Sequence, residues 1–63
     1  MLKSRIKTAL RVNDVTNYKL AELLGISEIT LYRNYLRKEE TLPAEEIDKV
    51  ITVIEQYAKE RES

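Results

Sequence analysis

The residue types that carry out most enzyme chemistry are missing from this chain of 63 residues. It contains no Cys and no His, so it has no thiolate nucleophile, no imidazole base and no typical zinc or haem ligand. Eleven Asp and Glu residues are present, but none stands in an apolar setting that would tune it as a general acid or base. We therefore expect a protein that is not an enzyme, with no catalytic residue, no cofactor and no metal site.

Length and composition predict a single small domain, residues 1–63, that works by binding. The chain is 43% apolar and 35% charged, and so short a chain buries only about 60% of the surface that its unfolded form exposes. It lacks a run of about 18 apolar residues that would span a membrane, and its start is too polar for a secretory signal. The sequence thus favours a cytoplasmic domain without a membrane partner.

Charge is distributed unevenly along the chain, although the net charge is zero. Residues 1–38 contain eight bases and three acids, whereas residues 39–63 contain three bases and eight acids. A polyanion responds to local potential, because the Debye length is only about 8 Å at physiological salt. The basic half can therefore face nucleic acid; the alternative is that these charges are merely solvated on helix surfaces.

Apolar spacing predicts an all-α fold, a small four-helix domain. Apolar residues recur at helical spacing in residues 2–12, 17–24 and 28–37, and again in a segment that begins near Pro43 and continues to Ala58. Thr16 and Ser27 are suited to N-caps, and Gly25 stands where a left-handed residue ends a helix. Two short helices joined by a brief turn at a glycine make a helix-turn-helix.

The stretch NYKLAELLGISEITLYRNYL, Asn17 to Leu36, resembles the helix-turn-helix of DNA-binding regulators of the phage repressor and Cro type. Within it, GISEITLYR is also similar to the DNA-binding end of resolvases and invertases. One position departs from the pattern: Asn34 stands where an apolar residue is usual, and Tyr35 and Leu36 follow it. This departure predicts a rotated or extended end of the third helix. The positions that carry the match are Leu20, Ala21, Leu24, Gly25, Ile26 and Leu31.

The resemblance implies that the third helix lies in the major groove of double-stranded DNA, with Leu31 and Tyr35 pointing inward. Arg33 would donate two hydrogen bonds to guanine, Glu28 would accept from cytosine, and Ile29 would touch a thymine methyl group. The remaining expected contacts are hydroxyl contacts from Ser27, Thr30 and Tyr32, a phosphate anchored by Asn17, and salt-sensitive attraction of the DNA backbone by Lys19, Arg37 and Lys38.

Each of these roles has a structural alternative. Arg33 could instead pair with Glu28 or Glu40 on the surface. Glu28 could simply favour the helix N-terminus, Asn17 could be an ordinary polar residue of a first turn, and Ile29 could belong to the core. Both Tyr18 and Tyr57 are expected to pack rather than to stack on a ligand.

Oligomeric state follows from energetics. One short helix reads only a few base pairs, so two copies on a palindrome would multiply specificity. We expect a homodimer through the fourth helix, where Val53, Ile54 and Tyr57 widen the apolar face; the alternative is that this face only closes the monomer core.

The functional prediction is a sequence-specific regulator of transcription, a repressor of phage, plasmid or bacterial origin that binds double-stranded DNA. The alternative is a modulator that uses the helix-turn-helix as a scaffold and binds a second regulatory protein. The zero net charge, together with Glu28 and Ile29 in the predicted reading surface, favours the alternative.

Overall fold

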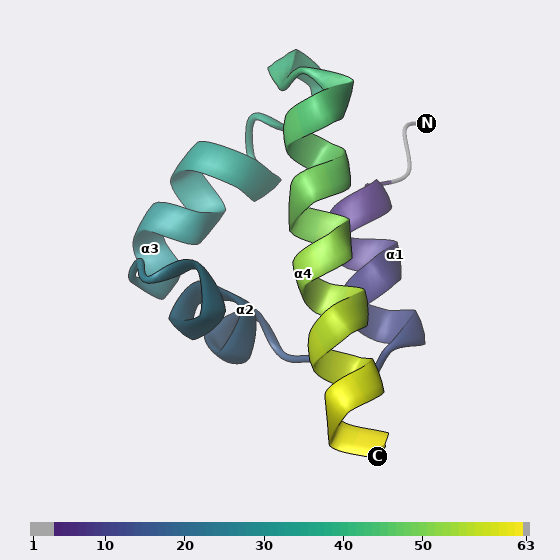
Figure 1. Cartoon of the computed structure of the whole chain (residues 1–63). Helices are drawn as coiled ribbons and strands as arrows, with labels where there is room; N and C mark the ends of the chain where they lie inside the picture. The colour runs from purple at the N-terminus through teal and green to yellow at the C-terminus, as the bar shows by residue number, and fades with distance from the viewer. Residues whose placement is uncertain (1–3, 63) are drawn as a thin grey trace.

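Helical structure accounts for most of residues 4–62, the part of the chain that the computed structural model describes (Figure 1). Within these residues there is no strand, which confirms the predicted all-α class. The first predicted helix was expected to include Leu2 and Lys3, which lie outside the described residues. The elements are α1 (Arg5–Val12), α2 (Asn17–Leu24), α3 (Glu28–Leu31), a π-helical segment (Tyr32–Leu36), a 3-10 turn (Glu39–Thr41) and α4 (Ala44–Glu62).

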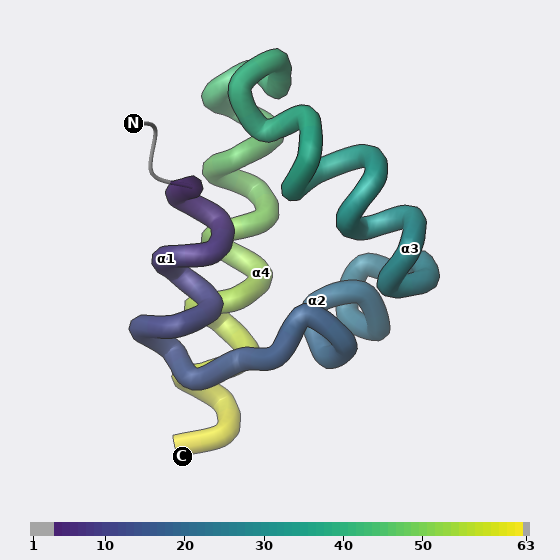
Figure 2. Tube along the Cα trace, turned by 180° about the vertical axis from the view of Figure 1, so that it is seen from behind, coloured from purple at the N-terminus to yellow at the C-terminus, as the bar shows by residue number. Residues whose placement is uncertain are grey.

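Helices α1 and α4 lie side by side in both views, and α2 and α3 form an arm beside them (Figures 1 and 2). Ile6 of α1 and Ile54 of α4 are fully buried in the core between these layers. Leu20 of α2 and Leu31 of α3 are also fully buried, and they join the same cluster. Each fully buried side chain of this kind stabilises the folded state by about 1.5–3 kcal/mol. The core therefore fixes the direction in which α3 presents its outer face.

The helix starts and the glycine turn form as predicted. The hydroxyls of Thr16 and Ser27 each accept the main-chain amide three residues further on, and Ser4 does the same for α1. Gly25 has φ 73° and ψ 30°, in the left-handed region that ends α2. The amide of Ile26 donates to the Ala21 carbonyl at 3.0 Å, which completes a Schellman motif. The turn between α2 and α3 is therefore held by local hydrogen bonds.

The third helix begins at Glu28 as predicted, and its end is rotated relative to a regular helix, as the departure at Asn34 predicts. Regular α-helix ends at Leu31, and the π-helical segment follows. The Arg37 amide donates to the Tyr32 carbonyl at 2.8 Å, a bond across five residues instead of four. A π turn accommodates one additional residue, so Asn34 is exposed while Leu36 is half-buried against the core. The π turn thus explains how a polar residue can occupy position 34, where an apolar residue is usual.

Most of the apolar face of α4 is used by the chain's own core. Ile54 is fully buried and Val50 is 2% exposed, so neither side chain is free to meet a second copy. Of the surface expected to form a dimer, Val53 and Tyr57 remain half-buried. The monomer core therefore explains much of the apolar width of this helix.

Polar contacts tie the ends of α1 to distant parts of the chain. The carboxylate of Glu39 accepts from the Ser4 hydroxyl and, at 2.7 Å, from the Arg5 amide, so it caps α1 across the molecule. At the other end, the Arg61 guanidinium donates to the carbonyl oxygens of Asn13 and Asp14 at 2.8 and 3.1 Å. These bonds link α4 and the segment before it to both ends of α1.

Candidate nucleic-acid interface

The outward face of α3 carries large side chains that the core does not use. Ile29 is 68% exposed and Tyr32 is 57% exposed, whereas Leu31 between them is fully buried. Arg33 follows Leu31 by two residues, which is about 200° around a helix, and it too is exposed. The expectation that Leu31 points inward is confirmed, and the alternative that Ile29 belongs to the core is wrong.

The π-helical segment extends this outward face. Because the Arg37 amide bonds to the Tyr32 carbonyl, Arg37 follows Tyr32 by one turn of this wider helix. In a regular helix the half-buried Leu36 would take that position. The segment therefore adds a second guanidinium to the row that begins with Ile29, Tyr32 and Arg33. We call these four exposed residues, Ile29, Tyr32, Arg33 and Arg37, the α3 face.

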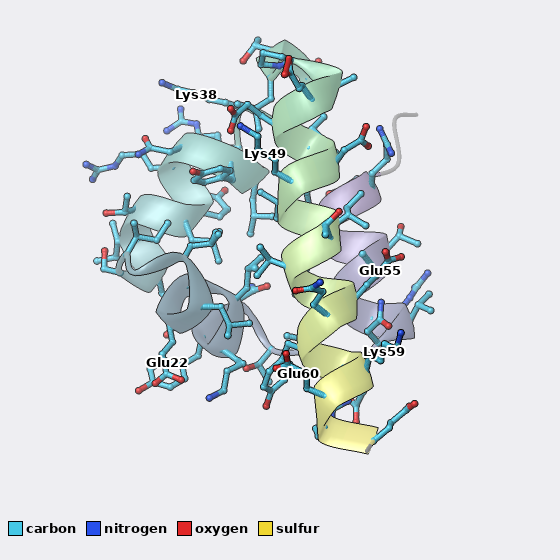
Figure 3. All side chains as sticks on the ribbon, in the orientation of Figure 1. Glu22, Lys38, Lys49, Glu55, Lys59 and Glu60 are labelled. Atoms are coloured by element: carbon cyan, nitrogen blue, oxygen red, sulfur yellow. The ribbon has the colours of Figure 1, made fainter. Side chains whose placement is uncertain are left out.

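The cations near the end of this face have no polar partner in the described part of the chain. Among residues 4–62, the side chains of Arg33, Arg37 and Lys38 form no hydrogen bond or ion pair. The alternative pairing of Arg33 with Glu28 or Glu40 is therefore not observed. In Figure 3, Lys38 points away from α4 at the upper end of the arm. This end of the molecule presents positive charge that the protein does not neutralise by direct contact.

Lys19 lies in a different environment from these cations. Its ammonium pairs with the Glu22 carboxylate at 2.5 Å and lies 5.5 Å from the centre of the Tyr57 ring on α4. The hydrogen bond and the negative charge of Glu22 raise the pKa of Lys19, which keeps the ammonium protonated. Because Glu22 offsets its charge, Lys19 is placed to attract phosphate less strongly than Arg33 or Arg37.

At the start of α3, the hydroxyls that were expected to touch DNA are already engaged. Ser27 Oγ accepts from the Thr30 amide at 3.1 Å and donates to Thr30 Oγ1 at 2.9 Å. Glu28, in the first turn, is exposed and beside the positive end of the helix. Asn17, the first residue of α2, is exposed as well. Ser27 and Glu28 lie at the start of α3, whereas Arg37 follows the π-helical segment after the end of α3.

Tyr18 is a surface residue that the sequence interpretation placed wrongly. It was expected to pack, but it is 63% exposed and borders a hollow of about 340 Å³ with Ser27 and Glu28. Its position two residues before the buried Leu20 puts it about 200° away from the core, a signal that helical periodicity does contain. Tyr57 does pack: it is half-buried, with the Arg61 guanidinium 5.4 Å from its ring centre.

No protein-family model, no curated protein and no solved structure matches the chain. Within residues 4–62, no helix is both long enough and apolar enough to cross a membrane. The same residues contain no group of three or more acidic side chains placed to hold a metal ion.

Proposed function

We propose that the protein is a sequence-specific DNA-binding regulator of transcription that places the α3 face in the major groove. The observation that carries this proposal is the row of exposed, unpaired guanidinium groups, Arg33 and Arg37, beside exposed Ile29 and Tyr32. Arginine recognises guanine through two parallel hydrogen bonds, and an apolar side chain suits the thymine methyl group. The turn at Gly25 fixes the orientation of α3, so the arginine and the apolar side chains on it have fixed directions.

Charge placement supports the same orientation. Arg33, Arg37 and Lys38 lie at one end of the arm, whereas most acids of the second half of the chain lie on α4 and in the segment before it. Glu39 and Glu40 line a hollow with Arg37, so these acids act on the same region. Glu60 lies near the other end of α4 (Figure 3) and, with a Debye length of about 8 Å, affects a phosphate near α3 only weakly. The protein can therefore approach DNA with its basic end although its net charge is zero.

Binding as a homodimer is part of this proposal. The α3 face is short, and each good bidentate contact discriminates by only about 1–3 kcal/mol. Two copies on a palindrome, with half-sites about 34–36 Å apart, would double the number of contacts that discriminate. Val53 and Tyr57 are the residues of the expected dimer surface that remain partly exposed.

The direct experiment is selection of duplexes from a random library by the purified protein, followed by measurement of the mass of the complex. We expect an enriched palindromic motif bound by two chains, and we expect affinity to fall steeply between about 50 and 200 mM salt. Retention of no duplex, or retention without any enriched motif, would contradict sequence-specific binding. A motif without symmetry bound by one chain would contradict only the dimer.

A second candidate is a modulator that binds another regulatory protein through the same surface. It is favoured by the apolar exposure of Tyr18, Ile29 and Tyr32, which is large for a surface made to meet phosphates. On this account Ile29→Ala would weaken a protein complex, and Lys38→Ala would leave binding unchanged. If the duplex selection yields a motif, this candidate loses its basis.

A further inference from the structure

A groove with an apolar floor lies between the arm and α4, on a different side from the α3 face. It has a volume of about 570 Å³, and Leu24, Tyr35, Val50 and Val53 contribute its apolar lining. Tyr35 and Val53 are half-buried and therefore still offer apolar surface to a ligand. Leu24 lies on α2 and Tyr35 in the π-helical segment, whereas Val50 and Val53 lie on α4, so both parts of the fold bound the groove.

The polar lining of the groove is mainly acidic. Glu45, Glu46 and Asp48 supply three carboxylates. The Lys49 ammonium lies 3.7 Å from Glu46, and the Arg5 guanidinium of α1 pairs with Asp48 at 2.8 Å. Glu45 is therefore the carboxylate without a cation beside it among the described residues of this rim. Figure 3 shows Lys49 on the side of α4 that faces the arm. Exposed pairs of this kind contribute about 0–1 kcal/mol, so they exchange easily for a partner's cations. Among these residues, negative charge exceeds positive charge.

We propose that this groove binds a basic amphipathic helix of a partner protein. Apolar side chains at helical spacing would lie on Tyr35 and Val53, and flanking Lys or Arg side chains would meet Glu45 and Glu46. This arrangement satisfies both the apolar floor and the acidic rim, whereas an acidic or neutral peptide would satisfy only the floor. Charge complementarity also sets which end of the groove the cations occupy.

Binding at the groove does not depend on DNA binding. Tyr35 lines the groove from the inward side of the π-helical segment, whereas Arg33 is exposed on the outward face of the arm. A partner helix can therefore occupy the groove while the α3 face contacts a duplex, although at Val53 it would compete with a second copy of the chain that dimerised through that residue. The proposal thus adds a second interaction surface to the proposed regulator and stands even if the first surface binds no DNA.

The test uses the full chain and a synthetic peptide probe of leucine and lysine, about 14 residues or four helical turns long. A matched peptide with glutamate in place of lysine serves as the control ligand. We expect the lysine peptide to bind and to shift the methyl NMR signals of Leu24, Val50 and Val53. Binding of neither peptide, or equal binding of both, would overturn the proposal.

Two substitutions separate specific docking from general attraction. Val53→Gln should lower the affinity for the lysine peptide about tenfold, because it removes apolar contact area at the floor of the groove. Val12→Gln is the control, since Val12 is 74% exposed on α1 and should have no effect. Circular dichroism shows whether each variant retains its helices. Equal losses in two folded variants would contradict docking in the groove.

A charge-matched pair keeps the test decisive if Val53→Gln does not fold. The double variant Glu45→Lys, Glu46→Lys should no longer bind the lysine peptide. The double variant Glu60→Lys, Glu62→Lys has the same net charge but changes exposed residues near the end of α4, so it should retain binding. Equal losses in both would show non-specific attraction. Self-association of the chain that the peptide cannot displace would show that a second copy fills the groove, and would likewise overturn the proposal.

Discussion

The main-chain amide of Arg37 donates a hydrogen bond of 2.8 Å to the carbonyl oxygen of Tyr32, five residues earlier. This bond defines the π-helical segment and lets Tyr35 and Leu36 both reach the core while Asn34 stays exposed. A single additional residue is thus absorbed at the end of α3 without disturbing the packing of Leu31. Single π turns inside helices often lie at functional sites.

Deletion of Asn34 should convert the π-helical segment into regular α-helix. The deleted chain would place Tyr35 and Leu36 three and four positions after Leu31, which is the inward side of a regular helix. We expect a folded protein whose free energy of unfolding lies within about 1 kcal/mol of the original value. Asn34 is exposed, so its deletion removes no core contact. Urea denaturation followed by circular dichroism measures this difference.

Deletion of Thr30 is the control for this experiment. It lies in the regular part of α3, so its loss rotates all later residues by about 100° and takes Leu31 out of the core. This variant should unfold. If both deletions unfold the protein, or both leave it folded, the assignment of Asn34 as the accommodated residue is wrong.

Local signals in the sequence were sufficient to predict the starts of α2 and α3 and the turn between them. Thr16, Ser27 and Gly25 act through hydrogen bonds and backbone angles that involve only neighbouring residues. Contacts across the molecule were not predictable in this way. The cap that Glu39 provides for α1 joins residues 34 and 35 positions apart, and no local pattern marks it.

The candidate site was predicted less completely than the fold. The resemblance implied outward positions for Arg33 and Ile29, with a core role for Ile29 as the alternative, and an inward position for Leu31; Arg33 and Ile29 are exposed and Leu31 is buried. The sequence did not reveal that Tyr57 approaches Lys19 from α4, because this contact forms only when the chain has folded. The Lys19–Glu22 pair, in contrast, has the i,i+3 spacing that a helix brings together, so the sequence did contain a signal for it.

Substitution of Gly25 tests the left-handed turn between α2 and α3. An added Cβ atom would meet nothing within 4 Å, so any loss arises from the backbone angle of 73° and not from a clash. Gly25→Ala should destabilise the protein by about 1–2 kcal/mol. Gly25→Asn should lower the free energy of unfolding less than Gly25→Ala, because Asn tolerates the left-handed region, and Gly25→Val should lower it most. If thermal or urea unfolding ranks Asn below Ala, contact rather than conformation controls this position.

Substitution of Glu22 tests the ion pair that engages Lys19. Glu22 raises the pKa of Lys19 from 10.5, so on the alkaline side the stabilisation by this pair is complete below that value and is lost as the pH rises through the raised pKa. Glu22→Gln removes the cause of this rise, but Lys19 stays protonated at neutral pH because its ordinary pKa of 10.5 is well above 7. The substitution also removes one negative charge from the arm. We expect affinity for the selected duplex to rise about two- to fivefold.

The control for this experiment is Glu60→Gln, which removes the same charge from an exposed position near the end of α4. Figure 3 shows Glu22 on the arm and Glu60 on α4. Titration of both variants with duplex at constant salt measures the difference. An equal gain from both substitutions would show that net charge, and not the position of Glu22, determines affinity.

Ile29 tests the apolar part of the α3 face. Its side chain is 68% exposed, and on a thymine it would cover the methyl group. Replacing each thymine of the selected site in turn with deoxyuridine removes only that methyl group. One replacement should weaken binding about fivefold for the original protein and have no effect on Ile29→Ala. If every replacement is neutral for the original protein, Ile29 does not read thymine.

Arg33 provides the most direct test of the central claim, that the α3 face reads DNA. The affinities of the original protein and of Arg33→Ala are compared on the selected duplex and on a shuffled duplex at one salt concentration. Arg33 is exposed and forms no hydrogen bond, ion pair or ring contact within residues 4–62, so the free energy of unfolding should change by less than about 0.5 kcal/mol. The preference for the selected duplex should fall about 10- to 100-fold. An unchanged preference in a folded Arg33→Ala protein would contradict the claim.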